Sequence, residues 1–217
     1  MKGALIVFEG GEGSGKTSHS LLVAEKLRAQ GFDVLHTKEP GGSEVGMKIR
    51  QLILDEQPEP IGSRAELLLF LADRAHHVEH VLKPAIAAGK IVICDRFSGS
   101  TFAYQIGGRE LPEPEMIIAM DAYARAGLTP DFVLFLEIDV AEGLARRHAG
   151  AAEEINRLDT ETVEFHQRVR EYFLQLYSSD PKAAVLNTSG TLEENAPKIM
   201  AAVQEGLQQA GIEIKNL

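Results

Sequence analysis

The chain has 217 residues, of which 44% are apolar and 25% are charged, as in ordinary globular domains. Its formal charge is −10, from 22 lysines and arginines against 32 aspartates and glutamates. This balance argues against non-specific binding of nucleic acid, because such binding needs a basic surface that neutralises phosphates. Cys94 is the only cysteine, which excludes an intramolecular disulfide framework and a cysteine-rich zinc site.

The length predicts a single domain over residues 1–217, with at most a lid attached to it. The N-terminal apolar run, Ala4–Phe8, is too short for a signal peptide or a membrane span. We therefore expect a cytoplasmic protein that does not bind a membrane.

Short apolar runs alternate along the chain with longer stretches of helical periodicity. The expected strands are residues 4–9, 33–37, 91–94, 131–138 and 184–187. The expected helices are residues 16–30, 43–55, 63–88, 98–106, 113–126, 140–148, 158–178 and 192–210. Strands that are apolar on both faces and alternate with helices predict an α/β fold, in which a five-stranded parallel sheet is covered by helices on both faces.

A glycine-rich loop, residues 10–17, joins the first expected strand to the first expected helix and fits the pattern GxxxxGK[ST] of a phosphate-binding loop, or P-loop. Glycines let backbone N–H groups surround an anion, and Lys16 can reach the β- and γ-phosphates of a nucleotide. The hydroxyl of Thr17 can bind Mg²⁺. The predicted ATP-binding residues are Gly10, Gly11, Glu12, Gly13, Ser14, Gly15, Lys16, Thr17 and Ser18.

A second glycine-rich turn, residues 39–42 (EPGG), follows the second expected strand, and the helix after it carries Arg50. The next expected helix, residues 63–88, begins with Ser63 and Glu66 at the spacing of a capping box. Phe70 and Arg74 are four residues apart in that helix and therefore share one face. Such a pair can stack on a base and hydrogen-bond its edge, although a core phenylalanine beside an arginine that extends to solvent is the simpler interpretation.

The same helix contains residues 76–80, HHVEH, which match the inverted zinc-protease pattern H-x-x-E-H. No third ligand is evident nearby in the sequence. A motif without its structural context is weak evidence, so we interpret these residues as a solvated polar face of the helix.

The strand at residues 91–94 ends in Asp95 and Arg96. The carboxyl ends of parallel strands meet at the edge of the sheet where ligands bind. We therefore expect Asp95 beside the Mg²⁺ held by Thr17, and Arg96 at the ligand. Three further arginines, Arg146, Arg147 and Arg157, flank a segment of small and acidic residues, which predicts a lid at about residues 146–157.

Several function classes share the P-loop. Guanine-nucleotide switches usually carry an Asn-Lys-x-Asp element, which is absent from this sequence, and motor ATPases are normally larger. Arginines placed to neutralise a second phosphate, together with a lid, favour a kinase of small molecules.

Three sequence elements together resemble bacterial thymidylate kinases, which are P-loop nucleoside monophosphate kinases. These elements are the P-loop with its preceding Phe8-Glu9, the turn KEPGG at residues 38–42, and DRF…T…AYQ at residues 95–105. The resemblance covers nearly the whole chain. It implies a five-stranded P-loop kinase fold with a short lid, usually a homodimer, that uses ATP and Mg²⁺ to convert deoxythymidine monophosphate (dTMP) to the diphosphate (dTDP).

The resemblance also implies roles for individual residues. Lys16 holds the donor phosphates, Thr17 and Asp95 bind Mg²⁺, Arg96 and Arg50 hold the acceptor phosphate, and Glu12 meets the sugar 3′-hydroxyl. Phe70 stacks on thymine, Arg74 reaches its exocyclic oxygen, Thr101 and Gln105 read the pyrimidine edge, and Tyr104 disfavours ribonucleotides. Pro40 and Ser100 complete the substrate set.

The lid departs from the resemblance. Family members with a glycine after the P-loop acid, here Gly13, generally have several lid arginines, whereas this lid has few, and Arg147 and Arg157 are the candidates for the transferring phosphoryl group. Two alternatives therefore remain open at the level of the sequence: another P-loop kinase of a small nucleotide or nucleoside, or a non-catalytic nucleotide-binding regulator.

Overall fold

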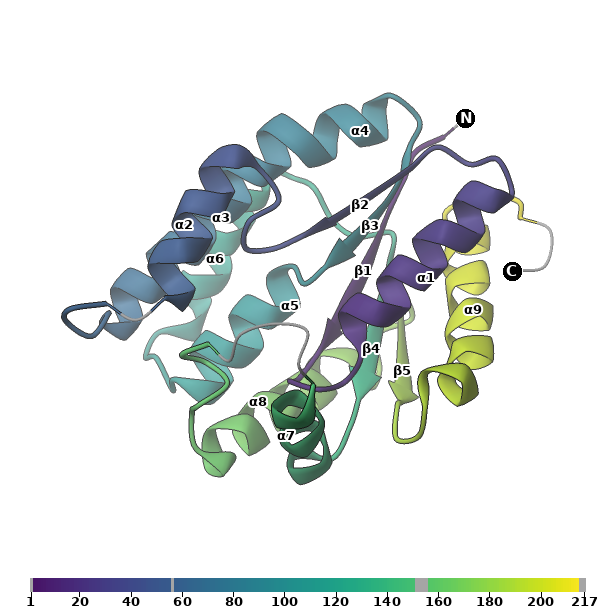
Figure 1. Cartoon of the computed structure of the whole chain (residues 1–217). Coiled ribbons are helices and arrows are strands. Elements are labelled where there is room, and N and C mark those ends of the chain that lie inside the picture. Colours follow the sequence, from purple (N-terminus) through teal and green to yellow (C-terminus); the bar gives the residue numbers. More distant parts are fainter. Residues whose placement is uncertain (1, 56, 151–155, 215–217) are drawn as a thin grey trace.

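The computed structural model describes residues 2–55, 57–150 and 156–214 (Figure 1). In these residues the chain forms a five-stranded sheet, in which the strands run parallel in the order β2-β3-β1-β4-β5. The strands are β1 (Ala4–Gly10), β2 (Val34–Lys38), β3 (Ile91–Asp95), β4 (Phe132–Glu137) and β5 (Ala183–Asn187). All five expected strands and the parallel sheet are confirmed.

Helices cover both faces of the sheet (Figure 1). One face is covered by α1 (Lys16–Ala29) and α9 (Leu192–Gln209). The other face is covered by the π-helical segment η1 (Val78–Leu82), α4 (Lys83–Ala87), the π-helical segment η2 (Phe102–Gly108) and α8 (Val163–Tyr177). Neighbouring residues of β1 separate into the two cores, Ile6 into the first and Val7 into the second, because successive side chains of a strand point to opposite faces.

Three helices, α2 (Glu44–Leu54), α3 (Ser63–His77) and α6 (Pro114–Arg125), lie side by side next to the sheet (Figure 1). The short helix α5 (Ser98–Thr101) leads into η2, and α7 (Val140–Ala149) approaches the P-loop. No helix in the described part of the chain is long and apolar enough to cross a membrane.

The expected helix over residues 63–88 is present, but it widens into the π-helical segment η1 before α4. Pro84 explains this locally, because proline has no N–H to donate to the carbonyl one turn earlier and its ring crowds that carbonyl. Val78 and Leu82 are fully buried in the core on the face of the sheet covered by η1, α4, η2 and α8.

Two helix N-termini differ from the sequence prediction, α3 in its cap and α8 in its first residue. The expected capping box of Ser63 and Glu66 is wrong: the residue that caps α3 is Gly62, without a side-chain hydrogen bond, and Glu66 is buried in ion pairs. The expected helix over residues 158–178 begins only at Val163, because the side chain of Thr162 caps it by accepting from the N–H of Phe165.

Candidate active site

A cavity of about 370 Å³ lies at the carboxyl edge of the sheet, where the P-loop, the EPGG turn, α3 and η2 converge. Most of the predicted site residues line it: Glu12, Gly13, Gly15, Lys16, Thr17, Ser18, Pro40, Arg50, Phe70, Arg74, Asp95, Arg96, Ser100, Thr101, Tyr104, Gln105 and Arg147. Gly10, Gly11, Ser14 and Arg157 are not among the residues that line it. Despite the charge of −10 on the whole chain, several cations therefore converge on this one cavity.

The P-loop adopts a conformation that requires glycine. Gly13 has a φ of +67°, and a Cβ added there would lie 1.9 Å from the carbonyl oxygen of Gly143 on α7. The Nζ of Lys16 donates to the carbonyl of Gly11 at 2.7 Å and to the hydroxyl of Ser14 at 3.3 Å. Burial and the charge of Arg96 lower the pKa of Lys16 to about 8, so the ammonium remains mostly charged at neutral pH.

Thr17 and Asp95 meet at the mouth of the P-loop, as expected. The hydroxyl of Thr17 donates to Oδ2 of Asp95 at 2.6 Å. Oδ1 of Asp95 is buried and has no hydrogen-bond partner among the described residues. A buried carboxylate oxygen without a partner, next to a hydroxyl, is a fitting pair of ligands for Mg²⁺, which prefers oxygen.

Arg96 takes the left-handed conformation at φ +71°, which is costly for any residue except glycine. Its guanidinium donates to the carbonyl of Gly10 at 2.9 Å and to Glu12 at 2.9 Å. The guanidinium also lies over the ring of Tyr104, with 5.2 Å between Cζ and the ring centroid. The Tyr104 hydroxyl donates to Oε1 of Glu12 at 2.5 Å. Burial raises the pKa of Glu12, but the charges of Arg96 and Lys16 outweigh this and lower it to about 2, so Glu12 is an ionised acceptor.

Glu9 was not predicted to have a role, but it organises the chain beneath this arginine. Its Oε1 accepts from the backbone N–H groups of Phe97 and Ser100 at 3.0 and 3.1 Å. Its Oε2 accepts from the hydroxyl of Ser100 at 2.5 Å, and that hydroxyl in turn accepts from Arg96 at 3.1 Å. Glu9 thus holds the start of α5 against the end of β1.

Arg74 is buried at the far end of the cavity, between two carboxylates. Its guanidinium donates to Glu39 at 2.8 Å, to Asp121 at 2.7 Å and to the hydroxyl of Thr101 at 2.7 Å. Phe70 lines the cavity one turn before Arg74 on α3, so the expected shared face is confirmed. The sequence contained no signal for Asp121, which reaches Arg74 from α6.

His77 does not lie on a solvated face, contrary to the sequence interpretation. It is fully buried, with Nδ1 2.9 Å from Glu39 and Nε2 2.8 Å from the hydroxyl of Thr37. His76 and His80 do remain together, with ring centroids 4.3 Å apart. In the described part of the chain no three His, Cys, Asp or Glu side chains are grouped to hold a metal ion.

The EPGG turn is held between α2 and α3. The carbonyl of Pro40, which follows a cis peptide bond, accepts from Arg50 at 3.0 Å. The N–H of Gly41 donates to Asp73 of α3 at 3.0 Å. Burial and the charge of Glu39 raise the pKa of Asp73 to about 6.

The ends of the predicted lid differ in where they place their arginines. Arg147 lines the cavity and pairs with Asp159 at 2.9 Å. Arg146 also lines the cavity and bonds Glu142 and the carbonyl of Thr188. Arg157 lies elsewhere, on Glu66 at 2.5 Å and on the carbonyl of Ile53. The middle of the predicted lid, residues 151–155, lies outside the described residues.

Comparison with known proteins agrees with this geometry. The family model described as thymidylate kinase matches residues 8–199. The chain is 42% identical to the thymidylate kinase of Nostoc punctiforme over 209 residues, which are 96% of this chain and 97% of that protein. It is 40% identical to that of Desulfovibrio desulfuricans, over 95% of this chain and 97% of that protein.

A solved structure is also similar. The crystal structure of thymidylate kinase from Ehrlichia chaffeensis superposes with a TM-score of 0.74 at 29% identity, covering 96% of this chain and 99% of that one. The P-loop fold, the cavity with its converging cations and these matches over nearly the full length lead to one conclusion. The chain belongs to the thymidylate kinase family, whose members are kinases that phosphorylate dTMP to dTDP.

Proposed function

We propose that this chain transfers the γ-phosphoryl group of ATP to dTMP in the cavity at the carboxyl edge of the sheet, through the residues that line it. Phosphorylation of dTMP to dTDP is the activity of its family. The observation that carries the proposal is that Lys16, Arg96 and Arg50 line one cavity. Aromatic and polar side chains that could hold a nucleoside line the same cavity. Phosphoryl transfer requires chiefly alignment of the two phosphates and neutralisation of their charge, and these cations can supply both.

The donor half consists of the P-loop. Its backbone N–H groups and Lys16 bind the ATP phosphates, and Lys16 exchanges its bond to the Gly11 carbonyl for phosphate oxygens. Thr17 and Asp95 would hold Mg²⁺, since their paired oxygens include the buried Oδ1 that has no partner among the described residues. Mg²⁺ bound there would neutralise charge on the phosphate oxygens.

The acceptor phosphate is held by Arg96 and Arg50. Arg96 is anchored by Gly10, Ser100 and Glu12, so its position is set before substrate binds. A preorganised cation costs little reorganisation when the reaction occurs, and this explains why a strained backbone is retained at φ +71°.

The sugar lies between Glu12 and Tyr104. The carboxylate of Glu12, with its pKa near 2, accepts a hydrogen bond from the 3′-hydroxyl. The Tyr104 ring is held in place by Glu12 and by Arg96, so it closes the space at the 2′ position and disfavours ribonucleotides.

The base stacks on Phe70 and is read by Arg74, Thr101 and Gln105. Nε, both N–H groups of Nη1 and one N–H of Nη2 of Arg74 are used by Glu39, Asp121 and Thr101. One N–H group of Nη2 remains for the exocyclic oxygen of thymine. Pro40 and Ser100 complete the walls of this pocket.

At the lid, we assign contact with the transferring phosphoryl group to Arg147, which already lines the cavity. The same role for Arg157 would require its guanidinium to leave Glu66 and Ile53. We retain the single domain over residues 1–217 and a cytoplasmic location as parts of the proposal.

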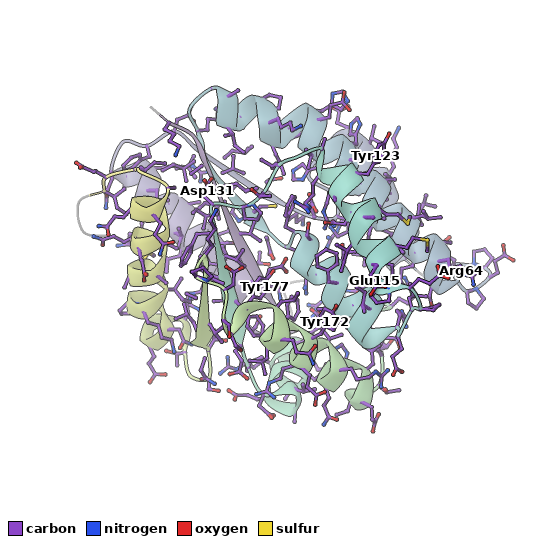
Figure 2. All side chains as sticks on the ribbon, turned by 180° about the vertical axis from the view of Figure 1, so that it is seen from behind. Arg64, Glu115, Tyr123, Asp131, Tyr172 and Tyr177 are labelled. Carbon is purple, nitrogen blue, oxygen red and sulfur yellow. The ribbon has the colours of Figure 1, made fainter. Side chains whose placement is uncertain are left out.

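A homodimer is also part of the proposal. Exposed apolar side chains lie on each of three adjacent helices: Leu52 on α2, Leu68 on α3, and Met116 and Tyr123 on α6. Figure 2 labels Tyr123 among them. Tyr123 is 88% exposed, which is unusual for so large a ring. A second copy that packs on these helices would cover it.

The test is to follow ADP formation with ATP and Mg²⁺ against a panel of nucleoside monophosphates. We expect turnover chiefly with dTMP, and none with the Lys16→Ala variant, which controls for contaminating kinases. Turnover chiefly with another monophosphate would discard the assignments at the base, and ATP binding without any transfer would discard the enzymatic role.

A further inference from the structure

Gln105 uses only one side of its amide in hydrogen bonds among the described residues. The residue is fully buried and lines the cavity. Its Nε2 donates to Oε1 of Glu66 at 3.0 Å, whereas its own Oε1 has no hydrogen-bond partner among the described residues. An amide is a donor on one side and an acceptor on the other, so the group that contacts Nε2 decides which side faces a ligand.

Glu66 can fix the orientation of this amide because an ionised carboxylate accepts hydrogen bonds and does not donate them. Its side chain is 1% exposed, and two guanidiniums balance its charge, with Arg109 at 3.0 Å and Arg157 at 2.5 Å. Burial raises the pKa of Glu66, but the hydrogen bonds from Arg109 and Gln105 and the charge of Arg109 outweigh this and lower it. An ionised carboxylate would repel the oxygen of Gln105 if the amide turned over.

We propose that Glu66 is a specificity-determining positioning residue, which holds the Gln105 amide so that Oε1 faces the base and selects a base edge with an N–H donor. This inference rests on the assignment of Gln105 to the base under Proposed function. Arg74 supplies a donor N–H group at the same end of the cavity. Gln105 and Arg74 together therefore offer the base one acceptor and one donor.

Thymine complements this pair through its ring N3–H and its neighbouring carbonyl. Cytosine has the opposite pattern, with an unprotonated ring nitrogen and an amino group, so it would place acceptor against acceptor and donor against donor. A site built around hydrogen bonds discriminates strongly in this way, because the mismatched groups are left buried without partners.

The Glu66→Gln variant separates this role from simple support of the fold. Glutamine at this position can pair with either side of the Gln105 amide, so the amide is free to turn over. We expect the ratio of kcat/KM for dTMP to kcat/KM for dCMP to fall by about 10- to 100-fold, the factor typical of one hydrogen bond to a charged group. Because both substrates are measured on one preparation, the ratio does not depend on the fraction of protein that is folded.

Arg109→Gln is the matched control. It removes a cation from the same carboxylate, and it leaves Glu66 to hold Gln105. The double variant Glu66→Gln/Gln105→Glu is the rescue, since it exchanges the two side chains and again places an acceptor toward the base. We expect the ratio to stay within about twofold of the original in the control and to recover in the double variant.

An unchanged ratio in Glu66→Gln would overturn the inference, as would an equal loss in Arg109→Gln or no recovery in the double variant. Gln105→Leu tests the underlying assignment separately. If that variant keeps the original ratio, Gln105 does not read the base, and the inference fails together with that assignment.

Discussion

Replacing Glu9 with glutamine is expected to stabilise the protein at neutral and alkaline pH. Glu9 is fully buried at the end of β1, where its two oxygens accept from the N–H groups of Phe97 and Ser100 and from the Ser100 hydroxyl. Glutamine has the same shape. Its oxygen can keep both backbone bonds, and its nitrogen can donate to the Ser100 hydroxyl.

The magnitude follows from linkage between protonation and folding. Burial raises the pKa of Glu9 from 4.5 to about 7, although the hydrogen bonds from Ser100 and the charge of Arg96 oppose this. The folded state therefore holds this proton more tightly than the unfolded state, and the protein loses stability as pH rises from 4.5 to 7. At about 1.4 kcal/mol per pH unit, the loss above pH 7 is about 3 kcal/mol.

The assay is urea unfolding of the original protein and of Glu9→Gln at several pH values between about 4.5 and 8. The difference in the free energy of unfolding should be near zero at the acid end and grow to about 3 kcal/mol in favour of the variant at pH 8. Glu25→Gln, at an exposed position of α1, is the control and should show no such trend. A Glu9→Gln variant that is less stable at pH 8, or a difference independent of pH, would refute the reasoning.

Three further outcomes are expected. Gly13→Ala should weaken ATP binding at least tenfold in a direct titration, because the new Cβ would collide with the carbonyl of Gly143. The control is Gly11→Ala, whose new Cβ has nothing within 4 Å, and its affinity for ATP should stay closer to that of the original protein. Asp121→Asn should lower the free energy of unfolding by about 3 kcal/mol in urea and raise KM for dTMP more than KM for ATP, because it leaves Arg74 with one carboxylate in place of two. Removing Mg²⁺ with EDTA should stop ADP formation, and adding it back should restore the rate.

The sheet was predictable because its signals are local. Residues 4–8 and 91–94 are apolar without interruption, which is typical of a short strand buried on both faces. The P-loop was equally accessible, because its glycines and Lys16 lie within eight consecutive residues between a strand and a helix. The placement of Asp95 and Arg96 followed from one rule, that parallel strands end at the same edge.

The wrong predictions concern residues whose local sequence pattern is compatible with two different structures. Ser63 and Glu66 have the spacing of a capping box, yet Glu66 is buried against Arg109 and Arg157 instead. His77 lies in a polar run, yet the turn of α3 directs it inward onto Glu39. In both cases a contact from another segment outweighs the local signal, because a buried polar or charged side chain must find a hydrogen-bond partner.

By itself, the sequence determined the order of strands and helices, the phosphate loop and the chemistry of the strand ends, since each depends on residues adjacent in the chain. Only the tertiary structure decided which distant carboxylate holds which cation. Asp121 reaches Arg74 across 47 positions, and Arg157 pairs with Glu66 and does not line the cavity. The reason is physical: a partner at long range is selected by packing and by the need to neutralise buried charge, and neither leaves a pattern in neighbouring residues.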